Sequence, residues 1–351
     1  MIIDSHSISK SIYLPGFLMK IKIYKILMIY IFHILIIIPV YAGENDNSAV
    51  NLLEDQLTVR FSLQIPVFLV CIKPGLKSGE TSDEENSRED AHITYMPDLR
   101  LSGGAGLYYK GFGFSYITRI TDIPTTSDHS ITEYTDIRLS EYYRKFGADL
   151  IYMNYTGFYL MDSNEHGYSG SDPEAKRTDM NLRTISASAF YLFSDDFSLR
   201  ASFMQNEKQN EWDWTIIAFI SAIYQSLDSD YSLIPQENEA AFSDNAGLES
   251  GVFKGIAAGP GFGITIPYKD YLFSAVSCFG SGFMHRKYET YDGTKTEHDG
   301  FYRINVKSSI GYNGTGYFYG LSFVFDSIAN YSGIRILANT YTTELYSGLH
   351  F

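Results

Sequence analysis

The sequence predicts an all-β protein, an antiparallel transmembrane up-and-down β-barrel of about 12 strands, with about 14 strands as the alternative. Three observations lead to this prediction. Apolar and polar residues alternate with a period of two through much of the chain, as in strands with one apolar face. The chain is rich in Tyr (29), Phe (24) and Gly (29), and its mean hydropathy of -0.12 is too polar for a bundle of membrane helices. The last predicted strand ends on Phe351, and a terminal Phe is usual in bacterial outer-membrane barrels.

The start of the chain has the pattern of a secretory signal peptide. Residues 19–42 contain a basic start, an apolar run at 26–38 and a small residue, Ala42, at the expected cleavage point. We expect translation to begin at Met19, because residues 1–18 add nothing that a signal needs. An uncleaved anchor is the alternative, although the apolar run is short for a span of about 20 residues. The expected parts are a signal peptide at 1–42, a polar lead at 43–56 and a barrel at 57–351, located in the bacterial outer membrane.

Charge and cysteine content exclude several other classes of protein. The formal net charge is -14 at pH 7, and removal of residues 1–42 takes away four Lys and one Asp, which makes the mature chain more acidic still. Such a surface disfavours nucleic acid as a partner. No apolar run after residue 42 approaches about 18 residues, so helical membrane spans are not expected. Cys71 and Cys278 cannot form a disulfide framework, and they are either two free thiols or one bridge.

Turn residues divide the barrel region into strands. Asn313-Gly314 is the strongest hairpin signal, and Lys110-Gly111 is another. Pro66 in the first strand indicates an edge or a bulge, because proline lacks a backbone N–H. The predicted strands are 57–72, 99–109, 111–121, 132–146, 148–160, 181–193, 197–209, 212–227, 252–266, 271–287, 301–312, 315–327 and 334–351.

Several of these strands show the facing pattern of a barrel. Within 111–121, Phe112, Phe114 and Tyr116 share one face, while Arg119 lies on the other with small residues. Large apolar side chains outside and small or charged ones inside are typical of an outer-membrane barrel. The same pattern is predicted at 197–203, where Phe, Leu and Ala at odd positions alternate with Ser and Arg at even positions.

The predicted strands are odd in number, whereas single-chain bacterial barrels have an even number. The short turns should all lie on the periplasmic side. Between the turns near residues 196 and 267, however, three strands are predicted, and an odd number of crossings would put these two turns on opposite sides of the membrane. Either residues 197–227 cross only once, as part of a strand pair that rises above the membrane, or the loop at 228–250 hides a crossing. The long loops at 73–91, 162–179 and 228–250 are expected outside the cell.

Basic side chains that alternate with lipid-facing aromatics are predicted to point into the lumen. One interpretation is a lumen packed with salt bridges, in which inward acids such as Glu344 also take part. The other is a basic lining that passes or holds an anion. The candidate lumen residues are Arg119, Asp136, Arg138, Arg144, Arg200, Arg303 and Lys307.

The last strand is also a predicted partner site. Its apolar face is the expected signal for the barrel assembly machinery, and it consists of Tyr341, Leu345, Leu349 and Phe351. Outer-membrane lipid and lipopolysaccharide are the other expected partners. The acidic loop at 73–91 is either a solvated loop or, as a more specific hypothesis, a segment that binds lipopolysaccharide through divalent cations. The sequence does not predict an oligomeric state.

Catalysis has weak support in the sequence. A Ser-His hydrolase needs a His beside a Ser and an orienting acid or amide. The mature histidines lie mostly in loops, and His285 in a strand is more simply a packed residue. No His-x-x-x-His metal spacing is present, and Gly259 to Gly263 is not a phosphate loop, since no helix pattern follows it. We therefore expect no enzyme, no catalytic or metal site and no cofactor.

Three blocks of the sequence carry a family resemblance: 95–98; 136–139 with 143–145 and Asp149; and 197–203 with Gln205, Glu207 and Gln209. Through these blocks the chain resembles an uncharacterised family of bacterial outer-membrane barrels known as a domain of unknown function. The resemblance covers roughly residues 55–351, and it implies a barrel and a location but no catalytic residues. Asp98 and the segment Glu211-Trp212-Asp213 depart from the pattern. The expected role is structural or passive permeation of small solutes, with a receptor or adhesin that uses the long acidic loops, or a lipid-modifying enzyme, as alternatives.

Overall fold

The computed structural model describes residues 49–52, 56–75, 91–98, 101–120, 132–169, 172–330 and 334–351. The predicted signal peptide at 1–42 and most of the polar lead lie outside the described residues. None of the helices in these ranges has the length and apolarity that a membrane span requires.

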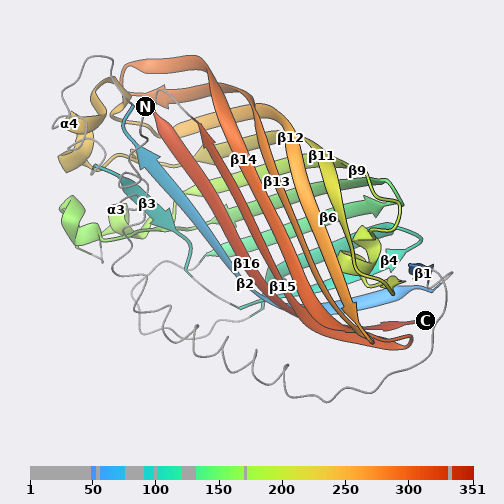
Figure 1. The fold of residues 1–351 in the computed structure, drawn as a ribbon. Helices are drawn as coiled ribbons and strands as arrows, with labels where there is room; N and C mark the ends of the chain where they lie inside the picture. Colours follow the sequence, from blue (N-terminus) through green and yellow to red (C-terminus); the bar gives the residue numbers. More distant parts are fainter. Residues whose placement is uncertain are drawn as a thin grey trace, which may run out of the picture. The chain divides into compact units, whose positions relative to one another are not determined.

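Twelve strands form a closed antiparallel barrel (Figure 1). The last strand closes the ring by pairing with the first, from Arg335 opposite Lys73 to His350 opposite Thr58. The prediction of an antiparallel barrel of about 12 strands is confirmed. The ring consists of β2 (Thr58–Lys73), β4 (Ser102–Tyr109), β5 (Phe112–Arg119), β6 (Glu133–Tyr142), β7 (Phe146–Thr156), β9 (Asn181–Leu192), β11 (Asp213–Asp228), β12 (Ser250–Tyr268), β13 (Tyr271–Thr290), β14 (Gly293–Asn313), β15 (Tyr317–Asn330) and β16 (Arg335–His350).

Two short strands extend the sheet outside this ring. β3 (Ile93–Met96) pairs with the second half of β2, and β8 (Tyr159–Leu160) pairs with β3. On this side β2 pairs with β4 up to Gln64 and with β3 from Val70 onward. Pro66 lies between the two pairings, where its missing N–H costs no ladder bond. The remaining elements are β1 (Val50–Leu52), which pairs with β10 (Glu207–Gln209), and the helical turns η1 (Ser163–His166), α3 (Pro173–Lys176), η2 (Arg200–Met204), η3 (Gln236–Asn238), α4 (Glu239–Phe242) and η4 (Ser243–Asn245).

The two ends of the barrel differ in their connections. At one end, the turn end, most neighbouring strands are joined by tight turns. Lys110 and Gly111 both have positive φ (46° and 89°), as the predicted hairpin turn between β4 and β5 requires. At the other end, the loop end, longer segments join most of the strands. Short turns face the periplasm in outer-membrane barrels, so the orientation predicted from the sequence would place the loop end at the cell surface.

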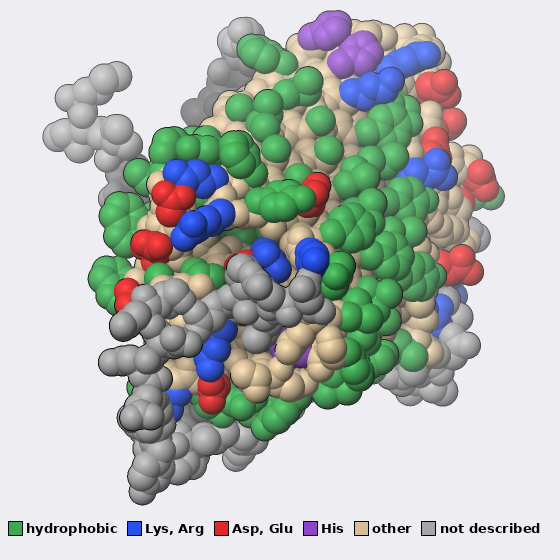
Figure 2. Space-filling view, turned by 90° about the vertical axis from the view of Figure 1, so that its right-hand side faces the viewer, with side chains coloured by type: hydrophobic (Ala, Val, Ile, Leu, Met, Phe, Trp, Pro, Cys, Tyr) green, Lys and Arg blue, Asp and Glu red, His purple; other side chains and the backbone are tan. Residues whose placement is uncertain are grey.

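Large apolar side chains cover the outside of the ring. In β5, Phe112, Phe114 and Tyr116 are exposed, whereas Ile117 is 2% exposed and points inward. Figure 2 shows hydrophobic side chains over much of one flank of the barrel. A closed sheet has no free edge, and an outer face of this kind suits contact with lipid.

The link between β9 and β11 is the main departure from the predicted strands. Residues 197–209 are not a barrel strand, because Arg200–Met204 form a π-helix and Glu207–Gln209 form β10. Phe197 and Leu199, predicted to face lipid, are buried (1% and 4% exposed). The link starts and ends at the turn end, which removes the odd strand. We call residues 193–212 the plug.

A second departure concerns a predicted loop. The sequence prediction ends one strand at residue 287 and begins the next at residue 301. In the structure, residues 288–299 complete β13 and β14, which turn at 291–292. The outward residues near this turn are polar or charged, so the strands continue beyond the apolar belt.

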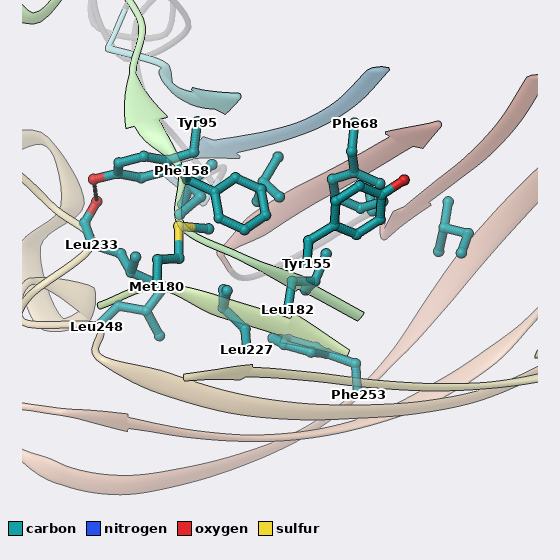
Figure 3. Packing of buried hydrophobic residues seen from close by; sticks show 14 of the residues in the cluster. Phe68, Tyr95, Tyr155, Phe158, Met180, Leu182, Leu227, Leu233, Leu248 and Phe253 are labelled. Atoms are coloured by element: carbon teal, nitrogen blue, oxygen red, sulfur yellow. Dashed lines mark hydrogen bonds between the residues drawn. The ribbon is translucent and has the colours of Figure 1, made fainter. Parts of the chain in front are cut away.

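Two apolar clusters occupy the inside of the barrel. The turn-end cluster combines wall residues with Phe197, Leu199 and Met204 of the plug. The loop-end cluster receives side chains from every ring strand except β4 and from the loops above them. Figure 3 shows its members, which include Phe68, Tyr95, Tyr155, Phe158, Met180, Leu182, Leu227, Leu233, Leu248 and Phe253.

Candidate functional site

The candidate site is the polar layer of the lumen between the two apolar clusters. A cavity of about 100 Å³ remains there, and it contacts Ile117 of the loop-end cluster and Met204 of the turn-end cluster. A cavity of this volume has room for a few water molecules. Its charged lining residues are Arg60, Arg138, Asp149, Lys307 and Glu344.

Arg60 of β2 joins the wall to the plug. Its Nη2 atom lies 2.7 Å from Glu344 Oε2, and the Ser322 hydroxyl donates to the same carboxylate at 2.7 Å. Its Nη1 atom donates to the Phe203 carbonyl at 3.0 Å and to Gln205 Oε1 at 3.1 Å. One guanidinium thus pairs with a wall carboxylate and fixes the plug backbone, which uses the fork of donors that arginine offers.

Lys307 of β14 crosses the lumen to Asp149 of β7. The two form an ion pair, although 158 residues separate them in sequence. The hydroxyls of Tyr142 and Ser140 each donate to Asp149 at 2.7 Å. Asp149 is 5% exposed, so this set of donors satisfies a carboxylate that has lost its water.

Asp136 and Arg138 form a second pair on the inner face of β6. Arg138 Nη2 lies 2.6 Å from Asp136 Oδ2, and the Tyr134 hydroxyl donates to the same oxygen at 2.8 Å. Residues two apart in a strand share a face, so this pair forms within one strand.

Arg303 of β14 is 1% exposed and closes the layer on the loop-end side. It pairs with Asp326 of β15, with Nε donating to Oδ1 at 2.9 Å. Its Nη1 atom donates to Ser186 at 2.8 Å and to Ser188 at 3.2 Å on β9 across the lumen. A buried guanidinium with this many partners is held rigidly and is not free to bind a solute.

The plug has an ion pair of its own. Arg200 Nη1 lies 2.8 Å from Glu207 Oε1, and Ser198 donates to the other carboxylate oxygen. Burial raises the pKa of Glu207, although Ser198 and Arg200 both favour its charged form. The plug therefore carries a carboxylate that resists ionisation.

The loop end is closed by the loops at 162–179 and 228–250, which pack against each other. We call the described residues of these two loops the cap. Arg177 pairs with Asp179 at 2.8 Å and donates to the carbonyls of Tyr231 and Ser232, each at 2.8 Å. Burial by itself would raise the pKa of Asp179, but the Arg177 guanidinium outweighs it and lowers that pKa. These contacts join the 162–179 and 228–250 loops, and the Tyr95 hydroxyl adds a bond to the Leu233 carbonyl (Figure 3).

A family model described as "Domain of unknown function (DUF4421)" matches residues 54–351, which include every strand of the closed ring. The chain belongs to this family. It folds as a closed antiparallel β-barrel, as the resemblance in sequence implied. A search of the curated proteins finds no relative of the DUF4421 chain.

Solved structures similar to the DUF4421 barrel include three proteins with less than 10% sequence identity to it. The outer membrane protease OmpT of Escherichia coli is 7% identical, with 86% of this chain and 98% of that chain covered and a TM-score of 0.37. The COG4313 outer membrane channel of Pseudomonas putida F1 is 9% identical, with 88% and 100% covered and a TM-score of 0.31. The attachment invasion locus protein Ail of Yersinia pestis is 9% identical, with 85% and 99% covered and a TM-score of 0.24. Similarity at this level carries no argument about the role of the DUF4421 barrel.

Not all the predicted lumen residues lie in the lumen. Arg144 is exposed in the turn between β6 and β7, where its Nε atom donates to the Asp195 carbonyl at 3.3 Å, so its assignment to the lumen is corrected. Arg200 lies on the plug instead of on a wall strand. Arg119, at the end of β5, is partly exposed and donates to the Thr132 carbonyl at 3.4 Å. The side chains of Asp136, Arg138, Arg303 and Lys307 lie inside the ring, in the pairs described above.

The sequence prediction missed several members of the polar layer. Arg60, Asp149 and Asp326 were not predicted as lumen residues, although each sits at an inward position of its strand. Asp149 stands between two apolar neighbours, Ala148 and Leu150, which signals its inward place, but no local pattern names its partner.

The apolar residues of the last strand lie where lipid or another protein can contact them. Leu345, Leu349 and Phe351 are 53%, 48% and 68% exposed, and Tyr341 is partly buried. Cys71 and Cys278 are both free thiols. Within the described ranges, no group of three or more His, Cys, Asp or Glu side chains is placed to hold a metal ion.

Proposed function

We propose that this DUF4421 protein is a sealed outer-membrane barrel with a structural role in the envelope. The observation that carries the proposal is the occupied lumen. Apolar clusters fill both ends, and the polar layer between them is cross-linked by ion pairs that leave about 100 Å³. A hydrated ion or small solute needs a continuous wide path, which this arrangement does not offer. The proposal includes export by a cleaved signal peptide.

Planar-bilayer recording tests the proposal. The purified wild-type protein should insert without a steady current, and so should R138Q and R303Q, because loss of one guanidinium does not remove either cluster. Insertion is verified in parallel by heat-modified gel mobility in the recovered sample. A reproducible unitary current in the wild type, with an ion selectivity that changes in R138Q or R303Q, would overturn the sealed-barrel proposal.

Passive permeation of small solutes is the second candidate. It is favoured by the plug, which is one segment held to the wall partly by hydrogen bonds from Arg60, Ser309 and Asn313. Replacing residues 197–209 by a Gly-Ser linker should still give no current if the barrel is structural, because the loop-end cluster is untouched. Conduction by this variant would instead favour a channel gated by the plug.

A receptor or adhesin role would use the cap. Its support is the ordered packing of the 162–179 and 228–250 loops, which gives the cell surface a fixed shape. Most of the 73–91 loop lies outside the described residues. Cells that express the protein with the 228–250 loop shortened should lose any adhesion to a host surface that wild-type cells show, while barrel assembly remains normal.

We further propose that the protein is not an enzyme and binds no cofactor or nucleic acid, and that its last strand meets the barrel assembly machinery. The support against a hydrolase is the placement of the histidines. His350 contacts Thr58 at 2.9 Å, but that hydroxyl belongs to a residue with no exposed surface. Phospholipid and ester hydrolysis by the purified barrel should stay at the level of the buffer, and turnover lost on mutation of one Ser or His would contradict this.

A further inference from the structure

One stretch of the outer wall carries basic and imidazole side chains where lipid should lie. Tyr224 of β11, Lys254 of β12, His285 of β13 and His298 of β14 are direct neighbours across four adjacent strands. They continue a row that begins with Ile185 of β9. All five point outward, so they form one band on the outside of the ring.

The charge of this band is unusual for the chain. The sequence has a net charge of -14, yet Lys254, His285 and His298 lie together, and Lys287 is the next outward residue of β13. The rings of His285 and His298 are 4.7 Å apart, and the Lys254 ammonium lies 5.8 Å from the Tyr224 ring. Figure 2 shows His and basic side chains gathered at one border of the hydrophobic area. An imidazole N–H and an ammonium are both donors to a phosphate oxygen.

A groove leads away from this band along the apolar wall. Two hollows, of about 690 and 650 Å³, share Ala187, Ala222 and Ile256 and so form one continuous depression. The first contains Lys254, His285 and His298, and the second runs on past Leu139 and Ile220. Alanines form the floor, while Phe283 (84% exposed) and Ile256 (62%) stand beside it. A long apolar groove on a lipid-facing wall has a shape into which an acyl chain fits.

The band lies toward the loop end of the ring. His285 and His298 flank the β13–β14 turn at 291–292, and Lys254 lies near the start of β12, after the 228–250 loop. With the loop end at the cell surface, the band meets the headgroups of the outer leaflet, and the groove runs toward the bilayer centre. The headgroup of a lipid in this leaflet would therefore lie at the band, and its acyl chain would lie in the groove.

We propose that this face is a specific site for one phosphorylated acyl lipid of the outer leaflet, the lipid A part of lipopolysaccharide. A phosphate contacts Lys254, His285 and His298, and an acyl chain lies in the groove over Ala187 and Ala222. Charge complementarity between a phosphate and the cationic band of an acidic protein selects this occupant over a neutral lipid. The proposal does not depend on whether the barrel conducts.

Native mass spectrometry of the delipidated full-length barrel, with added hexa-acyl lipid A, tests the site. The wild type should retain lipid A, and K254Q/H285Q/H298Q should bind it about tenfold more weakly or worse. Lys254 by itself contributes a factor of about five near an anionic surface, and the two imidazole donors add to it. K110Q is the matched control, since Lys110 also lies over a tyrosine ring, at 5.4 Å, but at the turn end. It should bind as the wild type does.

A second pair of variants tests the groove without any change of charge. Ala222 and Ala218 lie on the same outward face of β11, but only Ala222 lines the hollows. A222L should weaken lipid A binding several-fold, whereas A218L should not. All variants are first checked for the heat-modified mobility of a folded barrel.

Three results would overturn the proposal: equal lipid A binding by K254Q/H285Q/H298Q, equal binding of dephosphorylated lipid A, or equal loss in A222L and A218L. Displacement of lipid A by phosphatidylglycerol at equal concentration would also reject lipid A as the occupant.

Discussion

The two ends of the lumen are sealed in different ways. At the loop end, side chains of almost every ring strand meet one another and the cap, so the seal is part of the wall. At the turn end, one segment of the chain enters the ring and is held there by contacts such as Asn313 Nδ2 to the Glu207 carbonyl (2.8 Å) and Ser309 to the Ser202 carbonyl (2.7 Å). The loop-end seal cannot open without separating strands, whereas the plug can detach from an intact ring. Stability should therefore be distributed unevenly between the two ends.

The largest effect is expected at the loop end. Phe158 has no exposed surface, and its ring packs against Phe68 and Tyr155 with centroids 6.5 and 6.4 Å away. Phe158→Ala should lower the free energy of unfolding by about 3–5 kcal/mol, because a large cavity replaces the ring. Urea unfolding of the barrel in lipid vesicles measures this. A loss of less than about 1 kcal/mol would show that the cap does not unfold with the ring.

The same substitution in the plug sharpens the comparison. Phe197 is 1% exposed and belongs to the turn-end cluster. Phe197→Ala should lower the free energy of global unfolding by clearly less than the range of about 3–5 kcal/mol expected for Phe158→Ala. The reason is that the plug can open locally before the ring unfolds. Hydrogen exchange should instead accelerate in residues 193–212 and stay unchanged in β13 and β14. Equal losses in the two variants would contradict the proposed difference between the seals.

Acid should weaken the cap. The pKa of Asp179 is lowered in the folded protein, chiefly because Arg177 outweighs the effect of burial. The stability that Asp179 supplies is therefore present above its unfolded pKa of about 3.9 and is lost as the pH falls through the folded pKa. Asp179→Asn should cost about 1.5–3 kcal/mol at pH 7, the range for hydrogen bonds to a charged group. The measurement is the protection factors of the cap amides at pH 7 and pH 3, which correct for the intrinsic pH dependence of hydrogen exchange. They should be lower at pH 3, and the Asn variant should lose part of this pH dependence.

The plug should respond to acid in the opposite direction, with the smallest effect. Burial raises the pKa of Glu207, so protonation favours the folded plug. This stability is fully present below the unfolded pKa of about 4.3 and is lost as the pH rises through the higher folded pKa. Glu207→Gln should change stability by no more than about 1 kcal/mol, because the lost Arg200 pair offsets the relieved desolvation. The protection factors of the plug amides, which correct for the intrinsic pH dependence of hydrogen exchange, should be higher at pH 4.5 than at pH 7 in the wild type, but not in the variant. Lower protection of the plug in acid would show that the Arg200 pair dominates.

The errors of the sequence prediction discussed next lie at the turn end of the barrel, in the plug and in the β6–β7 turn. The alternation of Phe197, Leu199 and Phe203 with Ser198 and Arg200 has the period of a strand, but the segment forms a π-helix inside the ring. Burial in the lumen satisfies its apolar residues as well as lipid would. The period-two pattern cannot distinguish these two apolar surroundings. Arg144 was misplaced for a related reason, because the alternation was continued one step past the end of β6.

Local pattern alone determined most of the ring: where most of its strands run, which side chains of those strands face lipid, and that the apolar face of the last strand continues to Phe351. Each of those features depends on residues close in sequence and on the contrast between lipid and lumen. The charge pairs across the lumen, the plug and the lipid-facing band were decided by tertiary structure. Arg303 reaches Ser186 over 117 residues and Lys307 reaches Asp149 over 158, and such contacts depend on the register and closure of the ring, which no single strand encodes.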